Sequence, residues 1–230
     1  MRIIISPTKT MKRKNYTDQQ SELLFNEKAL KLRSILEKFD KEKIKKDFKV
    51  SDKLTEKVFE YYQNPKDPIA AINLYEGLAF KNMNLDNLSA TDFEYMQDHL
   101  YIMSAMYGAL RPFDMISEYR LDYVMKFEIN LYEFWKDYLE KLLKEEDFIV
   151  NLASNEFLNS VKHHNIINIH LLDEKGRNLS TQAKMGRGDM VSYIVKNKIK
   201  DPTELKKYNN MDYKYDKKRS DKNNYYFSKQ

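Results

Sequence analysis

The sequence of 230 residues predicts a single mixed α/β (α+β) domain, in which a central mixed sheet is flanked by helices. Short apolar, β-branched runs alternate with amphipathic segments at helical spacing along the whole chain. No repeat or flexible linker divides it, so residues 1–230 are expected to fold as one unit. With 42% hydrophobic and 33% charged residues, the composition is typical of a globular protein rather than a disordered one.

The first half of the chain is predicted to begin with a strand and to continue mainly through helices. Apolar periodicity and breaker residues predict a buried strand at Arg2–Ile5 that ends at Ser6-Pro7, helices at 20–39, 41–47 and 52–63, a strand at 70–75, and helical segments at 91–99 and 101–107. Ser51 is placed to cap the helix at 52–63.

The second half is predicted to be richer in strands. The same patterns predict an amphipathic helix over 131–143, a buried strand at 147–152, two strands at 166–172 and 178–183 around a turn at 173–177, a helix at 189–198, and a last strand at 224–227.

The composition excludes several kinds of site. With no Cys, the chain cannot hold disulfides, thiolate zinc sites or iron–sulfur clusters, and it has no cysteine nucleophile. His163 and His164 are adjacent and cannot share one face as chelators, so neither a metal nor a cofactor is predicted. No segment reaches the ~18 apolar residues that cross a bilayer, and the N-terminal apolar run is too short for a signal peptide. We expect a cytoplasmic protein without a membrane partner, and a monomer.

Positive charge is concentrated in three segments, although the net charge is only +5. These segments are residues 1–17, 41–57 and 206–222. Charge runs are usually solvated faces, but the three could form one surface if the fold brings them together.

The segment from Tyr107 to Leu121 combines a proline turn with two arginines. Pro112 favours extended backbone at Arg111, which is therefore expected at a rigid turn. A fixed guanidinium suits the binding of phosphate or carboxylate, and Arg120 follows closely. The alternative is a helix stop whose arginines pair with Asp114 and Glu118.

The loop after the first predicted strand carries hydroxyls and a cation. Loops at strand ends of α/β folds often bind ligands, so Ser6, Lys9 and Thr10 are candidates for holding a phosphate or nucleotide. The segment lacks the glycines of a Walker A loop, and its alternative interpretation is a solvated turn.

Residues 41–63 are expected to form a helix-hairpin-helix-like element. The backbone N–H groups at the start of its second helix would favour an anion, and Lys49, Ser51 and Lys53 lie around the junction. The glycines usual in such hairpins are absent, so an ordinary pair of surface helices is the alternative.

Two strand-to-helix junctions complete the candidate residues. Residues 183–188 are predicted as a glycine-containing loop in which Lys184 and Arg187 could bind an anion. Residues 151–156 present Asn151 and Ser154 where an active site could lie, although Ser154 could simply be an N-cap.

In their order along the chain, these segments resemble the bacterial YaaA family of peroxide stress response proteins. The matching motifs are Ile5-Ser6-Pro7-Thr8-Lys9-Thr10, Ser51-Asp52-Lys53-Leu54, Leu100 to Leu121, Leu131-Tyr132-Glu133-Phe134-Trp135, Asn151-Leu152-Ala153-Ser154, and Ala183-Lys184 with Arg187-Gly188. The chain departs from the family at Thr8, where Ala is common, and at Met185-Gly186, where basic residues are common.

The resemblance implies one domain of unusual topology with a basic cleft and a helix-hairpin-helix element. It also implies cytoplasmic protection against hydrogen peroxide, by limiting free iron and oxidative damage, and binding to duplex or branched DNA without sequence readout. By position, the residues that match basic family positions are Lys9, Lys53, Arg111, Arg120, Lys184 and Arg187.

Two other functions stay open. In the first, the chain is an enzyme acting on a nucleotide, nucleobase or other phosphate-bearing small molecule. Tyr107 or Glu156 would then carry protons, and one pocket would be lined by Ser6, Lys9, Arg111, Asn151 and Ser154. The second is direct iron binding, which would need Asp/Glu oxygen ligands that the spacing does not reveal.

Overall fold

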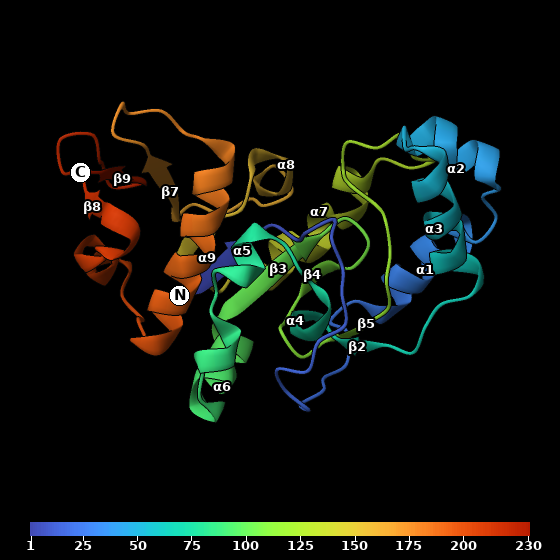
Figure 1. Cartoon of the computed structure of the whole chain (residues 1–230), viewed down its shortest axis with the longest axis horizontal. Coiled ribbons are helices and arrows are strands. Elements are labelled where there is room, and N and C mark those ends of the chain that lie inside the picture. The colour runs from blue at the N-terminus through green and yellow to red at the C-terminus, as the bar shows by residue number, and fades with distance from the viewer.

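A seven-stranded sheet with the order β4-β3-β1-β6-β7-β9-β8 runs through the centre of the protein in the computed structural model, which describes residues 1–230 (Figure 1). The strands are β1 (Arg2–Ile5), β3 (Leu100–Ser104), β4 (Gly108–Leu110), β6 (Ile149–Leu152), β7 (Ile166–Leu172), β8 (Tyr213–Tyr215) and β9 (Asn224–Lys229). The inner strands pair in parallel, and the two edge strands β4 and β8 are antiparallel to their neighbours. The mixed α/β class is thus confirmed.

Strand β1 occupies a central position because both of its faces are apolar. Ile3, Ile4 and Ile5 are almost completely buried, as expected for a parallel strand covered on both sides. A separate two-stranded sheet pairs β2 (Ile69–Ala70) with β5 (Met115–Ile116).

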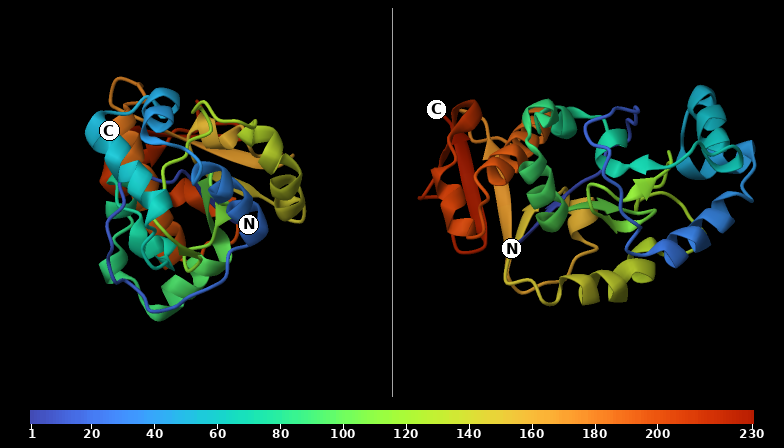
Figure 2. Two further views of the ribbon diagram at one scale, coloured as in Figure 1. Left: turned by 90° about the vertical axis from the view of Figure 1, so that its right-hand side faces the viewer. Right: turned by 90° about the horizontal axis from the view of Figure 1, so that it is seen from below.

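Helices cover both faces of the sheet and form one end of the protein (Figure 2). The α-helices are α1 (Asn26–Leu36), α2 (Lys41–Phe48), α3 (Asp52–Gln63), α4 (Ala71–Leu74), α5 (Leu78–Lys81), α6 (Ala90–His99), α7 (Leu131–Leu143), α8 (Asn155–Leu158) and α9 (Ser180–Lys196). Three 3-10 helices are η1 (Leu85–Asn87), η2 (Pro202–Lys207) and η3 (Asn210–Asp212). Helices α5, α6 and α9 pack together on one side, α7 lies on the other, and α1 to α3 extend away from the sheet (Figures 1 and 2).

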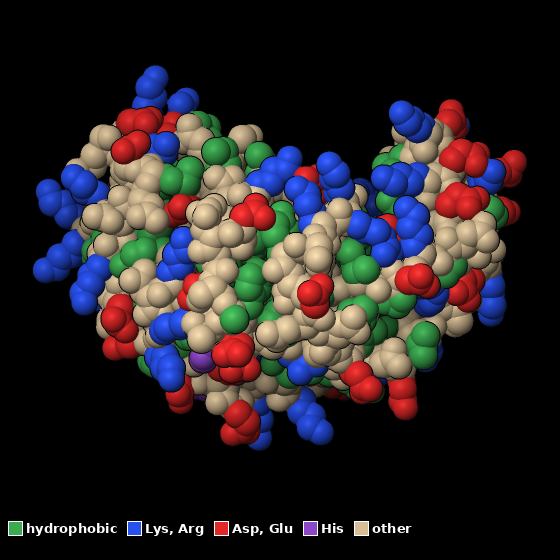
Figure 3. Space-filling view, turned by 60° about the horizontal axis from the view of Figure 1, so that its bottom comes forward, with side chains coloured by type: hydrophobic (Ala, Val, Ile, Leu, Met, Phe, Trp, Pro, Cys, Tyr) green, Lys and Arg blue, Asp and Glu red, His purple; other side chains and the backbone are tan.

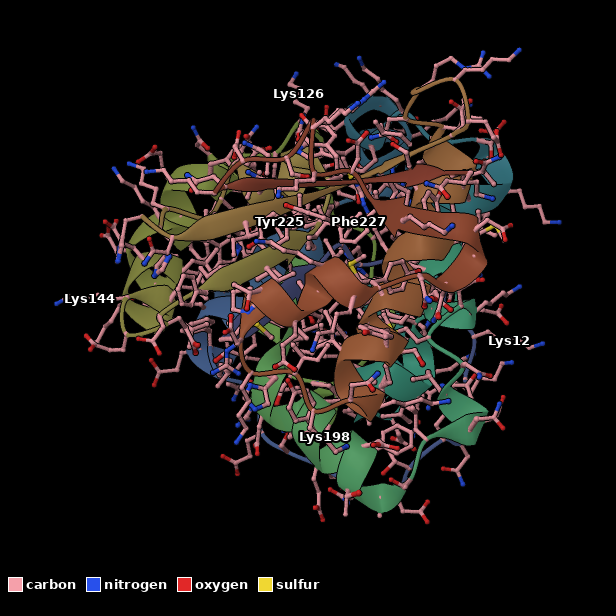
Figure 4. The ribbon with its side chains drawn as sticks, turned by 90° about the vertical axis from the view of Figure 1, so that its left-hand side faces the viewer. Lys12, Lys126, Lys144, Lys198, Tyr225 and Phe227 are labelled. Carbon is pink, nitrogen blue, oxygen red and sulfur yellow. The ribbon has the colours of Figure 1, made fainter.

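The apolar core is continuous from β1 to β9. Trp135 of α7 is fully buried, and its indole N–H donates to the carbonyl of Ala105 (2.8 Å). At the other end lies Phe227 of β9, labelled in Figure 4. It packs edge-on against Tyr208, the residue after η2, so this end of the sheet is also covered. No helix of the structure is both long and apolar enough to span a membrane.

Several predicted elements are wrong. Residues 101–107 were expected to be helical, but β3 is a strand; it is buried along its whole length, and a continuous apolar run has no period that separates helix from strand. Residues 70–75 form only the end of β2 and then α4. Residues 178–183 are not a strand, because α9 begins at Ser180, so the turn at 173–177 closes no hairpin.

Other predicted elements are confirmed closely. Helix α3 spans the predicted residues, and the Ser51 hydroxyl caps it by accepting from the backbone N–H of Leu54 (3.4 Å). Helix α7 and strand β7 also have the predicted bounds.

Candidate functional site

A cavity of about 640 Å³ lies where the carboxyl ends of β1 and β6 meet α5, α8 and α9. Its walls include the Ser6–Thr10 loop, Ser154 and Glu156 at the start of α8, and Lys184 and Arg187 of α9. Ligands of α/β proteins often bind at the carboxyl ends of parallel strands, and this volume suits a small organic ligand. We call it the inner cavity.

The floor of the inner cavity is fixed by hydrogen bonds between two strand ends. The backbone N–H of Ser154 donates to the Ser6 hydroxyl (2.8 Å), and the two hydroxyl oxygens are 3.3 Å apart. Ser154 occupies the N-cap position of α8, but its side chain makes no capping bond. The two hydroxyls are therefore held together at the cavity, and the Ser154 hydroxyl is not used to cap the start of α8.

One wall depends on the close approach of α5 to α9. A Cβ atom added at Gly188 would overlap the carbonyl oxygen of Ala79, so only glycine permits this contact. A Cβ atom at Gly77, just before α5, would likewise overlap the side chain of Thr8. Residues 183–188 are thus part of α9, which corrects the predicted loop, and Lys184 and Arg187 lie three residues apart on one helix face.

Arg187 has no partner of opposite charge. The chain contains no carboxylate within 4 Å of its guanidinium, and its buried Nε–H has no acceptor. Burial lowers the pKa of Arg187 from its usual value. Lys184 is exposed and also lacks a carboxylate partner.

Lys9 and Arg120 share one carboxylate. The Asp122 carboxylate lies 3.0 Å from Nζ of Lys9 and 3.1 Å from Arg120. Arg120 lines a smaller adjoining hollow of about 40 Å³ together with Lys9, outside the inner cavity. Its Nε–H is buried without an acceptor.

Glu156 is a carboxyl group of the inner cavity that has no ion-pair partner. One of its oxygens accepts from the backbone N–H of Tyr123 (3.0 Å). Burial, together with repulsion from Asp122, raises the pKa of Glu156 above its usual value. Tyr123 stacks on Tyr132, whose hydroxyl donates to the Glu156 carbonyl (3.0 Å), so the start of α8 is held in place.

The predicted site residues fall into three groups. Six line the inner cavity: Ser6, Lys9, Thr10, Ser154, Lys184 and Arg187. Arg120 lies next to it, as described. The remaining five, Lys49, Ser51, Lys53, Arg111 and Asn151, lie elsewhere.

Arg111 does not face the inner cavity, which corrects that expectation. Its Nε donates to the Asp114 carboxylate (3.0 Å) and a terminal nitrogen donates to the carbonyl of Glu22 (2.6 Å). Asp114 is fully buried, so Arg111 is held where it neutralises this carboxylate. The alternative pairing with Asp114 is confirmed, whereas Glu118 pairs with Arg13 (3.2 Å) instead of Arg120.

Asn151 and Tyr107 also serve the fold rather than the inner cavity. The Asn151 side chain donates to Asn168 (2.9 Å) and accepts from the backbone N–H of Ala153 (2.9 Å), which shapes the turn after β6. Tyr107 is buried with its hydroxyl directed at the Ser117 carbonyl (3.4 Å), and burial raises its pKa to about 12. The prediction that one pocket contains Arg111 and Asn151 together with Ser6, Lys9 and Ser154 is therefore wrong for Arg111 and Asn151.

The two remaining lysines lie beside the turn between α2 and α3. Lys49 ends α2 in the left-handed conformation (φ 52°), and Lys49, Ser51 and Lys53 are exposed. Lys41 and Lys45 pair with Glu56 and Asp52, but no carboxylate lies within 4 Å of Lys49 or Lys53.

The surface is hollowed between the lobe that carries α1 to α3 and the rest of the protein, with Lys and Arg side chains on both sides (Figure 3). We call this feature the basic hollow.

Sequence reasoning missed several residues of the inner cavity. Glu76, Lys81 and Phe157 line it although no motif marks them, because the fold brings α5 and α8 to the strand ends. Gly77 was the available signal: a glycine just ahead of a short helix can mark a close backbone contact.

Comparison with known proteins identifies relatives over the full length. The family model described as peroxide stress protein YaaA matches residues 1–219. UPF0246 proteins of Finegoldia magna and Clostridioides difficile (strain 630) are 37% and 35% identical to the chain. Both alignments cover 100% of this chain, with 98% and 100% of the respective relatives. The chain therefore belongs to the YaaA family of peroxide stress proteins.

Proposed function

We propose that the chain acts in peroxide stress by binding duplex or branched DNA through phosphate contacts along the basic hollow. The observation that carries this proposal is the pair of exposed, unpaired lysines, Lys49 and Lys53, beside the N-terminus of α3. Neutralising DNA phosphates with such cations releases counterions, which gives affinity without sequence readout.

The geometry of the α2–α3 turn supports a phosphate contact. Helix α3 has 12 residues, and its dipole favours an anion at this end, although the Ser51 hydroxyl already accepts from the N–H of Leu54 and Asp52 lies in the first turn. The left-handed conformation of Lys49 makes the turn short, so that Lys49 and Lys53 flank the same helix start. Lys45 and Lys41 contribute less, because Asp52 and Glu56 already neutralise them.

The test compares two double variants with the same change in net charge. Lys49→Ala/Lys53→Ala removes the proposed contacts, whereas Lys141→Ala/Lys144→Ala removes two exposed lysines at the end of α7, on the other side of the sheet. Binding to a fluorescent 20-base-pair duplex at fixed salt should weaken about tenfold or more for the first variant and less than threefold for the second. Equal losses in both would refute a contact at the α2–α3 turn.

The biological part of the proposal is that DNA binding limits oxidative damage and the effects of free iron. The Lys49→Ala/Lys53→Ala variant should then fail to restore peroxide resistance to cells that lack the protein, while Lys141→Ala/Lys144→Ala restores it. Full rescue by the first variant would separate peroxide protection from DNA binding.

A further inference from the structure

Arg187 stands out because every other arginine of the protein is neutralised. Seven of the eight arginines have a carboxylate within 4 Å: Arg2, Arg13, Arg33, Arg111, Arg120, Arg177 and Arg219. Arg187 has none, although its Nε–H is buried and lacks an acceptor. Arg187 is partly buried, and the partial removal of a cation from water without a partner is unfavourable, so an anion that enters the inner cavity would offset this cost.

The charge of the inner cavity fits a dianion. Lys9 and Lys81 each have a carboxylate within reach, Asp122 (3.0 Å) and Glu76 (4.0 Å), although Asp122 is shared with Arg120 and Glu76 with Lys14. Lys184 and Arg187 are the two lining cations left without a carboxylate, and Glu156 is the lining carboxyl left without a cation. A phosphate monoester carries about −1.5 to −2 at neutral pH, whereas a DNA phosphodiester carries only one negative charge.

Hydroxyl groups also line the inner cavity. Ser154 makes no capping bond, so its hydroxyl hydrogen is available to a ligand. The Ser6 hydroxyl is already used twice, since it accepts from the Ser154 backbone N–H and donates to the Ser154 hydroxyl oxygen, and Thr10 adds a further, exposed hydroxyl. Cations and hydroxyls that line one cavity are typical of phosphate recognition.

Part of the lining is apolar and suits an organic group. Ile5, Leu152, Phe80 and Phe157 contribute to the walls, and the volume of about 640 Å³ exceeds what a bare phosphate would fill. Glu156 provides a carboxyl oxygen that could accept from a ligand hydroxyl.

We infer that the inner cavity binds a small phosphate monoester of about mononucleotide size. Arg187 and Lys184 hold the phosphate with the hydroxyl of Ser154, which Ser6 positions, and the organic group lies against Phe157 and Leu152. This site is distinct from the lysines of the α2–α3 turn, and it stands or falls independently of DNA binding.

The test measures binding of three probes to the full-length protein by isothermal titration calorimetry: AMP, phenyl phosphate and adenosine. We expect AMP or phenyl phosphate to bind with a Kd below about 1 mM and adenosine to bind at least tenfold more weakly. Arg187→Gln and Lys184→Gln should each weaken phosphate-ester binding at least tenfold, while Lys49→Ala/Lys53→Ala leaves it unchanged.

Three results would overturn the inference. One is no binding of either phosphate ester at 5 mM, and another is adenosine binding as tightly as AMP. The third is full affinity in Lys184→Gln, an exposed substitution that should not disturb folding. Thermal melting of each variant identifies any that fail to fold, and Lys184→Gln keeps the test decisive if Arg187→Gln is unstable.

Discussion

At the scale of single residues, Arg111 and Arg187 carry the same guanidinium in opposite surroundings. Arg111 neutralises a carboxylate that is fully buried and that also accepts from the Ser21 hydroxyl (2.7 Å). Arg187 has a buried Nε–H and no anion. The first arrangement stabilises the fold, whereas the second leaves binding capacity free for a ligand.

Arg111→Ala is expected to destabilise the protein without weakening DNA binding. It would leave the buried Asp114 carboxylate without its cation, which should lower the free energy of unfolding by about 2–4 kcal/mol. Urea denaturation measures this loss, with Lys41→Ala as the control, because the exposed Lys41–Glu56 pair should contribute less than about 1 kcal/mol. A stable Arg111→Ala variant with impaired DNA binding would contradict the structural role.

Glu156→Gln is expected to stabilise the protein at neutral pH but not in acid. The pKa of Glu156 is raised by burial and by Asp122, so the ionised side chain opposes folding once the pH exceeds that pKa. Below the pKa in the unfolded chain, the wild-type carboxyl is neutral in both states, and the difference should vanish. Melting temperatures at pH 4 and pH 7.5 test this: the variant should melt up to about 2 °C higher at pH 7.5 only. A variant less stable at pH 7.5 would show that the charge is favourable.

At the scale of elements, helix α9 forms one wall of the inner cavity and part of the core at once. Gly186 and Gly188 lie inside this helix, where glycine normally lowers helix stability by about 1 kcal/mol relative to alanine. Their neighbours explain their presence: a Cβ at Gly186 would meet the end of the Leu171 side chain, and one at Gly188 would meet the backbone of Ala79.

The two glycines provide a matched pair of substitutions. Gly188→Ala must push α5 away from α9, so we expect the free energy of unfolding to fall by about 2–4 kcal/mol. The same movement should change the shape of the inner cavity, because both helices line it. Gly186→Ala meets the end of the Leu171 side chain and the edge of the Tyr213 ring but no backbone, and it gains helix propensity, so it should destabilise the protein by less than Gly188→Ala, by about 1 kcal/mol or less. Denaturant midpoints compare the two directly, and equal destabilisation would mean that the α5–α9 contact is not rigid.

Elements in which apolar and polar residues alternate with a clear helical period could be predicted from the sequence, whereas elements that are apolar on all sides could not. The amphipathic helix α7 and the capped helix α3 were predicted with their observed bounds. The strand β3 and the start of α9 were not, because β3 is buried on both faces and the glycines of α9 resemble a loop until the packing partner is known.

The residues of the candidate site likewise divide into those that the sequence could predict and those that it could not. Ser6, Lys9 and Ser154 were predictable because they follow strands whose ends meet. The place of Arg111 was not, since a rigid turn can direct a guanidinium towards a ligand or towards a buried carboxylate. Only the tertiary contact with Asp114 decides between them.

At the scale of the whole molecule, the distribution of charge matters more than its sum. The net charge of +5 is modest, and many lysines are neutralised by nearby carboxylates. Unpaired cations remain at the α2–α3 turn, and the surface between this lobe and the rest of the protein is hollowed and bordered by Lys and Arg (Figure 3). Such a surface should attract a polyanion at a rate and affinity that fall with ionic strength.

The most direct test of DNA binding is the affinity for a short duplex measured by fluorescence anisotropy between 50 and 300 mM salt. For the wild type we expect log K to fall linearly with log salt concentration, and we expect Lys49→Ala/Lys53→Ala to reduce the slope by about 2, one for each lost phosphate contact. A wild-type affinity independent of salt, or a slope that the double variant leaves unchanged, would contradict DNA binding through the α2–α3 turn.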